Sequence, residues 1–294
     1  MNNPKILIVT TSKGAYAPKR FNEEALKIGI DTQLASYRSF SWDITDKRTT
    51  CLIKGEMLPD AKYVILREPG FEGTYTPQRD YLLHYYHSKG TKILNAESFL
   101  HWSILDKFTQ MIELQKAQLP FVESKNYCSK KQIREGVLEF PVIIKNHSGS
   151  HGDKVYKINS QDELELFLAS KDILPSTLLI QPFLPGGEDI RVIVIGGKAI
   201  GAIKRIAVDS HLTNYSAGGK VEKYDLKDGS NAVRIAESTA SLFKCEYAGV
   251  DLMKDQNGDW KVLEINRSCQ FEGFEKGTGM NAAKLTLDYL LPNY

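Results

Sequence analysis

The 294-residue sequence lacks the features that would place it in several common functional classes. Its net charge is only +2, so no basic excess points to nucleic acid or to an anionic membrane surface. No apolar run approaches the length of a membrane span, and the run that ends at Thr10 is too short for a signal-peptide core. We therefore expect a cytoplasmic protein that binds neither nucleic acid nor membrane.

Cysteine and glycine patterns exclude further kinds of site. The four cysteines, Cys51, Cys128, Cys245 and Cys269, are scattered and form no C-x-x-C pair and no cluster with histidine, which favours free thiols over a disulfide framework. No G-x-G-x-x-G follows the first apolar strand, so a dinucleotide site is not indicated. No G-x-x-x-x-G-K-[ST] phosphate loop is present either.

What is present is an ordinary globular composition with a clear order of elements. Charged residues make up 25% and apolar residues 42%, and the length indicates about two domains. Strand-like and helix-like segments alternate in the order 6–9, 21–28, 63–66, 81–86 and 91–94. This βαβ rhythm predicts a small parallel sheet covered by helices, in a first unit at residues 1–98.

The rest of the chain mixes helices and strands as an α+β arrangement, which we divide into units at 99–185 and 186–294. Apolar spacing predicts a helix from Ser103, as its N-cap, to Gln118. Ser160-x-x-Glu163 is a capping-box signature for another helix. Other predicted helices lie at 129–135, 231–243 and 281–290, and strands lie around Phe121 and at 141–145, 154–158, 178–181, 190–195 and 199–206.

The most informative segment is a predicted β-hairpin over residues 249–267, turned by an Asn-Gly pair. Asp251 lies near the end of one strand, and Glu264 and Asn266 lie at the matching end of the other. Because Glu264 and Asn266 are two residues apart, their side chains leave the same sheet face. Hard oxygen ligands on a sheet suit Mg²⁺. Taken alone, the same residues also fit an ordinary hairpin with polar residues near its end.

A second candidate is the loop of small residues that follows Lys145 at the end of an apolar strand. Small residues let backbone N–H groups approach phosphate oxygens, and a lysine supplies a point charge. The candidate phosphate contacts are Lys107, Lys145, Ser148, Gly149, Ser150 and Gly152. Seen in isolation, the loop also fits a flexible hairpin turn and Lys107 a solvated helix lysine.

An extended linker and two strands complete the candidate constellation. Backbone groups of the linker could bind an adenine edge, and its residues include Gln181, Phe183 and Leu184. Asp189 and Arg191 alternate along one strand, with Arg205 on its partner. A carboxylate near a ribose and guanidinium groups near a transferred phosphate would suit these residue types. A cross-strand salt bridge is the alternative interpretation.

Taken in order, these segments resemble the ATP-grasp superfamily, in particular the RimK-like ligases that join amino acids to carboxylates. The resemblance extends from about Phe99 to Leu290, and the first unit is similar to a pre-ATP-grasp domain. Its most specific parts are Asp189-Ile-Arg191, Ala248-Gly-Val-Asp251, and Glu264-Ile-Asn266-Arg267-Ser268 followed by Glu272-Gly-Phe-Glu275-Lys276. The resemblance implies an α/β (α+β) ATP-grasp fold.

The resemblance also implies cofactors and roles for individual residues. The cofactors are ATP and Mg²⁺, with Mn²⁺ as the alternative metal. Lys107 and Lys145 would be the nucleotide lysines, and the linker Gln181 to Leu184 would be the adenine hinge. The implied metal ligands are Asp251, Glu264 and Asn266.

Two loops depart from the RimK-like pattern. Cys269-Gln270 stands where Pro-Gly usually follows the Asn-x-Ser turn. The loop 211–219 keeps an Asn and a Gly pair but lacks the basic residues expected with them. Both loops would face the acceptor substrate, so the sequence supports ATP use better than any particular substrate.

The implied enzyme is an ATP-dependent carboxylate–amine ligase that forms an amide through an acyl phosphate. Arg191 and Arg205 are candidates for stabilising oxyanions, and Arg267 for binding the carboxylate substrate, with a surface salt bridge as its alternative role. The acceptor is a small molecule, an amino acid, a peptide or a protein tail, and a homo-oligomer remains open. The alternatives are a kinase on the same scaffold, for which no base stands out, and a non-catalytic nucleotide-binding regulator, against which the complete ligand set argues.

Overall fold

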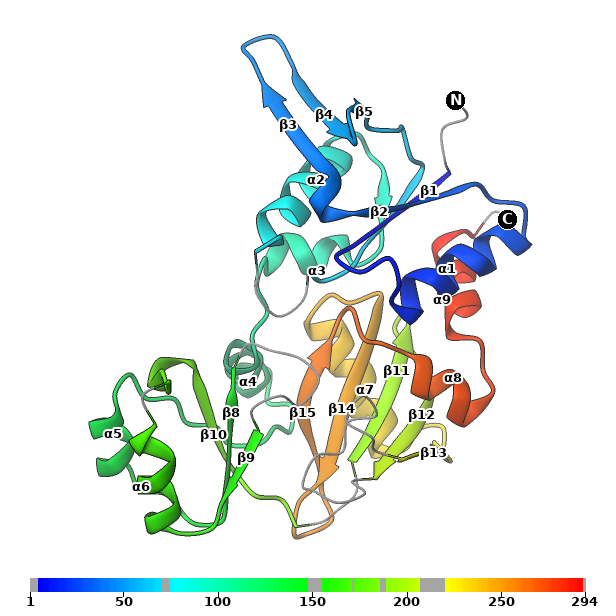
Figure 1. Cartoon of the computed structure of the whole chain (residues 1–294). Helices are drawn as coiled ribbons and strands as arrows, with labels where there is room; N and C mark the ends of the chain where they lie inside the picture. Colours follow the sequence, from blue (N-terminus) through cyan, green and yellow to red (C-terminus); the bar gives the residue numbers. More distant parts are fainter. Residues whose placement is uncertain are drawn as a thin grey trace.

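The computed structural model describes residues 5–69, 74–147, 155–170, 172–185, 189–206 and 220–292. Figure 1 shows an N-terminal unit in blue and cyan, a small unit in green, and a larger sheet that runs from yellow-green to orange. This mixed arrangement of helices and sheets is the α/β class that the sequence predicts. None of the helices in the described ranges combines the length and the apolar character that crossing a bilayer requires.

The N-terminal unit contains a parallel sheet with helices on both faces. Its elements are β1 (Ile6–Thr10), α1 (Tyr16–Lys27), β2 (Thr32–Ser36), β6 (Tyr63–Leu66), α2 (Thr76–Ser88), β7 (Lys92–Ile93) and α3 (Ala96–His101). The four strands lie in the order β2-β1-β6-β7. Ile6 and Ile8 of β1 pack into one core and Leu7 and Val9 into another, because both faces of the strand are covered. The predicted parallel sheet is confirmed, whereas α3 is an element that the sequence pattern did not predict.

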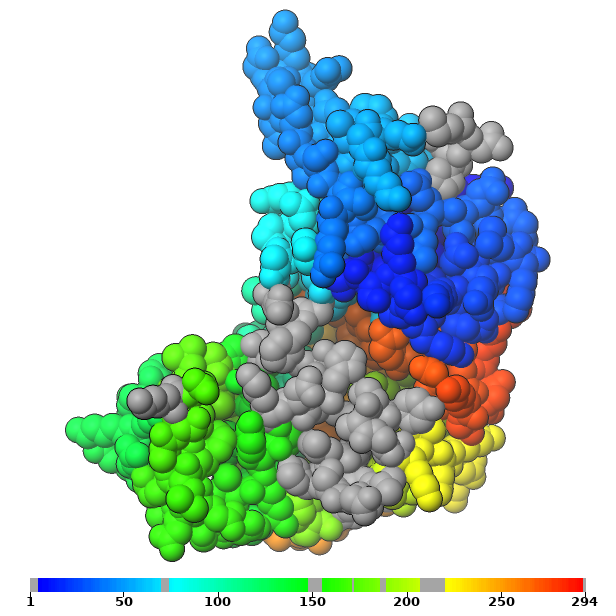
Figure 2. Space-filling view, viewed as in Figure 1, coloured from blue at the N-terminus to red at the C-terminus, as the bar shows by residue number. Residues whose placement is uncertain are grey.

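A second, antiparallel sheet of the N-terminal unit is absent from the sequence prediction. It contains β3 (Phe40–Ile44), β4 (Thr49–Ile53) and β5 (Glu56–Met57), preceded by the 3₁₀ turn η1 (Tyr37–Ser39). Its β3–β4 hairpin projects from the body of the protein (Figure 2). Only Cys51 and Ile53 of these three strands are buried, so the apolar alternation that reveals a strand is weak here.

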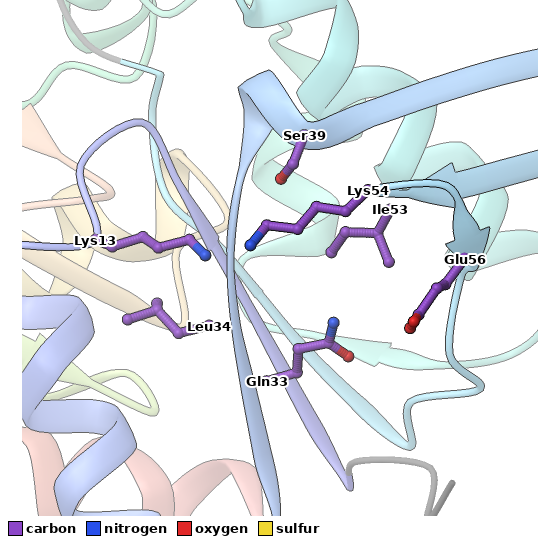
Figure 3. Close-up of a pocket in the computed structure, with 7 residues that line it drawn as sticks. All are labelled: Lys13, Gln33, Leu34, Ser39, Ile53, Lys54 and Glu56. Atoms are coloured by element: carbon purple, nitrogen blue, oxygen red, sulfur yellow. The ribbon is translucent and has the colours of Figure 1, made fainter.

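A cavity of about 360 Å³ lies in the N-terminal unit between this small sheet and β2. Its lining residues are Lys13, Gln33, Leu34, Ser39, Ile53, Lys54 and Glu56. The amines of Lys13 and Lys54 point toward one another there (Figure 3). Lys54 and Glu56 are exposed, so this cavity is open at the surface and its charges are solvated.

The small unit is a three-stranded antiparallel sheet covered by two helices. Its elements are α5 (Lys130–Glu135), β8 (Val142–Asn146), β9 (Val155–Ile158), α6 (Gln161–Ala169), the 3₁₀ turn η2 (Pro175–Thr177) and β10 (Leu178–Pro182), with strand order β10-β8-β9. The predicted capping signature is confirmed. Ser160 Oγ accepts from Glu163 N at 3.3 Å, and Glu163 Oε2 accepts from Asn159 N at 2.8 Å.

The larger sheet has five antiparallel strands in the order β13-β12-β11-β14-β15. Its elements are β11 (Asp189–Ile195), β12 (Lys198–Ile206), β13 (Lys220–Tyr224), α7 (Asn231–Leu242), β14 (Tyr247–Lys254), β15 (Trp260–Asn266), α8 (Glu272–Thr278) and α9 (Ala282–Leu290). One face packs on α7 and on α4 (Lys107–Lys116), and the other face packs on α8 and α9. Helix α9 lies beside α1 (Figure 1), so the two ends of the chain share one hydrophobic core.

Two local predictions are wrong. Helix α4 begins at Lys107 rather than after Ser103, because Asp106 is its N-cap and accepts from the backbone N–H groups of Phe108 and Thr109. Ser103 instead donates its hydroxyl to Asp80. The segment around Phe121 forms an isolated bridge to the larger sheet instead of a strand.

Candidate active site

The predicted acidic hairpin exists and carries its polar residues at one end. Strands β14 and β15 pair so that Asp251 lies opposite Glu264 and Gly249 lies opposite Asn266. The register shifts directly after Asp251, an irregularity that is common beside functional sites. Asn266 Nδ2 donates to Glu264 Oε1 at 2.8 Å, so these two side chains share a face as their spacing predicts.

Two lysines from other elements approach this hairpin. Lys107 is the first residue of α4, and its Nζ lies 3.1 Å from Glu264 Oε2. Lys145 comes from β8 in the small unit, and burial, together with the charge of Lys107, lowers its pKa to about 8 against the attraction of Glu264. Burial opposes the ionisation of Glu264, but Lys107 and Lys145 outweigh it and hold the pKa of this carboxyl well below its ordinary value. At neutral pH the site therefore holds an ionised glutamate between two cations.

An ordered row of opposite charges crosses the three neighbouring strands. Arg191 binds Asp251 through two parallel hydrogen bonds of 2.7 Å each. Arg205 Nη2 lies 2.7 Å from Asp189 Oδ1 and 3.0 Å from Asp251 Oδ2. Asp189, Arg205 and Asp251 are buried. The cross-strand salt bridge that the sequence left open is thus observed, and roles for these residues toward a nucleotide stay predictions.

The predicted hinge lies at the end of β10. Gln181 is buried and donates through Nε2 to Ser124 Oγ at 2.8 Å. Phe183 N donates to the carbonyl of Pro141 at 3.0 Å, and the amine of Lys157 lies 3.9 Å from the Phe183 ring centre. Phe183 and Leu184 are half-buried. The predicted phosphate-loop residues Ser148, Gly149, Ser150 and Gly152 lie outside the described residues.

Arg267 has a different environment from the predicted one. It is buried, and its Nε lies 2.6 Å from Glu68 Oε1. Its other nitrogens donate to the backbone carbonyls of Ser98, Trp102 and Ser103. This placement speaks against the predicted contact with a substrate carboxylate, because protein acceptors already take its donors. It also speaks against an exposed surface salt bridge.

Glu68 and Phe99 join Arg267 to the N-terminal unit. Glu68 Oε2 accepts from Arg79 Nη1 at 2.6 Å, so one carboxylate bridges two buried arginines. Both guanidinium groups lie over the Phe99 ring, with Cζ 4.3 Å from the centroid for Arg267 and 4.7 Å for Arg79. Sequence reasoning missed these residues. The available signal was that Arg67-Glu68 directly follows the buried strand β6, at the carboxyl edge of a parallel sheet where ligand sites gather.

The hairpin residues fit a magnesium ion by the chemistry of their donor atoms. In the described part of the chain, no group of three or more His, Cys, Asp and Glu side chains gathers as a metal site. Asp251, Glu264 and Asn266 instead offer two carboxylates and one amide oxygen, which are hard ligands suited to Mg²⁺. Their present partners are protein cations and an amide N–H, contacts that a divalent cation would replace in part.

The fold is that of the ATP-grasp superfamily. The family model described as the RimK-like ATP-grasp domain matches residues 97–290, and the chain belongs to this family. Membership confirms the predicted class, an ATP-dependent carboxylate–amine ligase that forms C–N bonds.

Curated relatives agree with this assignment, and solved structures share the fold. A probable alpha-L-glutamate ligase of Psychromonas ingrahamii is 28% identical over 98% of this chain and 95% of its own length. One of Legionella pneumophila is 29% identical over 97% of this chain and 95% of its own length. The ATP-grasp ligase PsnB complexed with its minimal precursor superimposes with a TM-score of 0.74 at 18% identity, covering 99% of this chain and all (100%) of that one. A RiPP-associated ATP-grasp ligase of Chryseobacterium gregarium gives 0.70 at 15% identity, covering 99% and 97%.

Proposed function

We propose that this ligase attaches an acidic amino acid, L-glutamate in the first instance, through its amino group to the carboxylate of a peptide or protein tail. Two facts about similar proteins support the choice of substrates. The curated relatives are named probable alpha-L-glutamate ligases, and several solved neighbours are complexes with precursor peptides. The observation that carries the chemistry is the approach of Lys107, Lys145 and Arg191 to the carboxylates of Glu264 and Asp251.

Each predicted site residue except Arg267, whose donors are taken by protein acceptors, has a part in this proposal. Asp251, Glu264 and Asn266 would hold Mg²⁺, which neutralises charge on the β- and γ-phosphates of ATP when bound. Lys107 and Lys145, with the small-residue loop Ser148, Gly149, Ser150 and Gly152, would bind those phosphates. The linker Gln181 to Leu184 would hold the adenine, and Asp189 would lie on the ribose side of the nucleotide.

Positioning and charge stabilisation then account for the reaction. An oxygen of the substrate carboxylate attacks the γ-phosphorus, ADP leaves, and an acyl phosphate forms. The amino group next attacks the acyl carbon, phosphate leaves, and the amine loses a proton as the amide forms. Arg191 and Arg205 would stabilise the negative charge that develops on oxygen in both steps. Exclusion of water protects the acyl phosphate from hydrolysis.

A hydroxylamine trap tests this function. With ATP, Mg²⁺, hydroxylamine and a peptide that ends in a free carboxylate, we expect a hydroxamate to form in step with ADP release, because hydroxylamine replaces the amine nucleophile. The peptide has no side-chain carboxylate, and its form with an amidated C-terminus is the matched control, which should give no hydroxamate. A phosphorylated peptide would instead support the kinase alternative, and release of ADP from ATP in the presence of the free-carboxylate peptide without hydroxamate would count against the acyl-phosphate route.

Lys145 predicts a pH dependence of ATP binding. Its pKa of about 8 in the free protein, against an ordinary 10.5, means that the amine loses its charge above pH 8, and phosphates bound beside it would restore the proton. The apparent affinity for ATP should therefore fall about tenfold between pH 7 and pH 9, with uptake of nearly one proton at pH 9. Calorimetry in buffers of different ionisation enthalpy measures both quantities. Lys145→Met should bind ATP weakly with a flatter profile, and a wild-type affinity that is equal at both pH values would contradict the assignment.

A further inference from the structure

Arg67 is a buried arginine without an acidic partner among the described residues. It is 4% exposed, and both of its side-chain hydrogen bonds come from Nη2, which donates to the backbone carbonyls of Ser268 and Cys269. Its buried neighbours Arg79 and Arg267 share the carboxylate of Glu68 instead. A desolvated guanidinium is costly unless an anion compensates it. The Nε and Nη1 groups of Arg67 are thus available to bind an anion, which the described residues do not supply.

The position of Arg67 in the sheet is one at which α/β proteins bind ligands. The chain runs from β1 outward to β2 and returns to β6 on the other side of β1, so the strand order reverses between β1 and β6. Ligands bind beyond the carboxyl ends of the strands at such a switch point. Arg67 is the first residue after β6, and its N–H donates to the carbonyl of Val9 in β1 at 2.9 Å.

Cys269 connects this position to the charged row of the larger sheet. Its carbonyl accepts from Arg67 at 3.0 Å, while its side chain lies against Gly249 and Arg191. A Cβ atom added to Gly249 would come within 2.9 Å of Cys269 Sγ and 3.3 Å of Arg191 Cδ. Burial raises the pKa of the Cys269 thiol, and the nearby charges of Arg191 and Arg67 oppose this rise. Cys269 therefore lies in space between Arg67 and Arg191, the arginine that binds Asp251.

We propose that Arg67 binds a carboxylate of the amine-bearing substrate and selects an amino acid that keeps a free carboxylate. This inference rests on the proposed ligase function. The carboxylate to be activated must meet the γ-phosphate beside Lys107 and Lys145, whereas the incoming amino acid retains its own carboxylate throughout the reaction. A guanidinium binds such a group through parallel charge-assisted hydrogen bonds. Held at Arg67, the amino acid can present its amine toward Arg191, where the acyl group would be.

Steady-state kinetics of Arg67→Gln test the assignment. With ATP and peptide saturating, KM for L-glutamate should rise about 10- to 100-fold, because a hydrogen-bonded charged pair is lost. KM for ATP should stay unchanged. Arg48→Gln, which removes an exposed arginine from the N-terminal hairpin turn, is the matched control and should behave as wild type. Arg67→Lys should fall between the two, since lysine keeps the charge and loses the paired geometry.

Hydroxylamine separates substrate binding from structural damage. It carries no carboxylate, so hydroxamate formation by Arg67→Gln should equal that of wild type. An equal loss of hydroxamate and amide formation, or an unchanged KM for L-glutamate, would overturn the role of Arg67. Absence of hydroxamate from the wild-type enzyme would instead count against the proposed function itself.

A substrate analogue makes the test independent of the variant's stability. Wild-type enzyme should use L-glutamate at least about tenfold better than the diamide of glutamate, which keeps the amine and loses both carboxylates. Arg67→Gln should lose most of this preference. Equal use of both compounds by the wild-type enzyme would overturn the proposal even if no Arg67 variant folds.

Discussion

Glu264→Gln is expected to lower amide formation about 10²- to 10³-fold while the fold persists. Glutamine keeps the shape of the side chain and the hydrogen bond with Asn266, but it removes the charge that lies 3.1 Å from Lys107 and opposite Asp251. A magnesium ion would lose a carboxylate ligand, and the lysines would lose the anion between them. Amide product is followed by peptide mass, the Mg²⁺ requirement by titration, and folding by thermal unfolding.

The larger sheet offers a matched control for this change. Glu222 is an exposed glutamate on β13 of the same sheet, and Glu222→Gln should leave the rate and the Mg²⁺ requirement unaltered. Asn266→Ala should resemble Glu264→Gln, since it removes the third oxygen ligand. Wild-type turnover at unchanged Mg²⁺ in both site variants would refute the metal assignment.

Arg191→Lys is expected to produce the second large effect, a fall in kcat of about 10²-fold or more at saturating ATP and Mg²⁺. Lysine cannot make the two parallel 2.7 Å bonds that arginine makes with Asp251, and it offers fewer fixed donors to charge developing on oxygen. Hydroxamate and amide formation should be measured side by side. A parallel loss places the defect in formation of the acyl phosphate, whereas preserved hydroxamate with lost amide places it in attack by the amino acid.

An exposed arginine serves as the control for Arg191. Arg234 lies on the outer side of α7, and Arg234→Lys should retain wild-type rates. Arg191 also holds a proposed metal ligand, so its variant must be assayed over a range of Mg²⁺ concentrations. Full recovery of kcat at high Mg²⁺ would show that Arg191 acts only by placing Asp251, and the proposed oxyanion role would then be wrong.

Local sequence patterns predict the elements that carry this site, because turns, strand alternation and helix caps depend on residues that are close together in the sequence. The Asn-Gly turn and the apolar strands define the β14–β15 hairpin, and period-two spacing places Glu264 and Asn266 on one face. The capping residues Ser160 and Glu163 fix the start of α6 in the same way. Where a helix has two plausible caps, as at Ser103 and Asp106, tertiary contacts decide. Ser103 binds Arg79 and Asp80 of the N-terminal unit, and Asp106 caps the helix.

The sequence alone does not predict which side chains from distant parts of the chain contact one another. Arg267 follows Asn266, and its proximity to the ligands suggests a substrate contact. Its actual acceptor, Glu68, is 199 positions away, and only the folded arrangement of the two units brings them together. The pairing of Arg191 with Asp251 is likewise a matter of strand register, which the printed order of residues leaves undetermined.

The hydrophobic core shared by the two ends of the chain has a consequence for cooperativity. Ile6, Ile8 and Phe21 from the first unit pack in one cluster with Phe271 and Leu287 from the last. The division at 1–98, 99–185 and 186–294 stays a prediction, and the shared cluster indicates that the first and last of these units are coupled in stability. A fragment that begins near residue 97, where the family match starts, would expose one wall of this core and lose Glu68 as the partner of Arg267. The N-terminal unit and the C-terminal part of the chain should therefore unfold in a single cooperative transition. The three-stranded β8–β10 unit is the part able to unfold by itself.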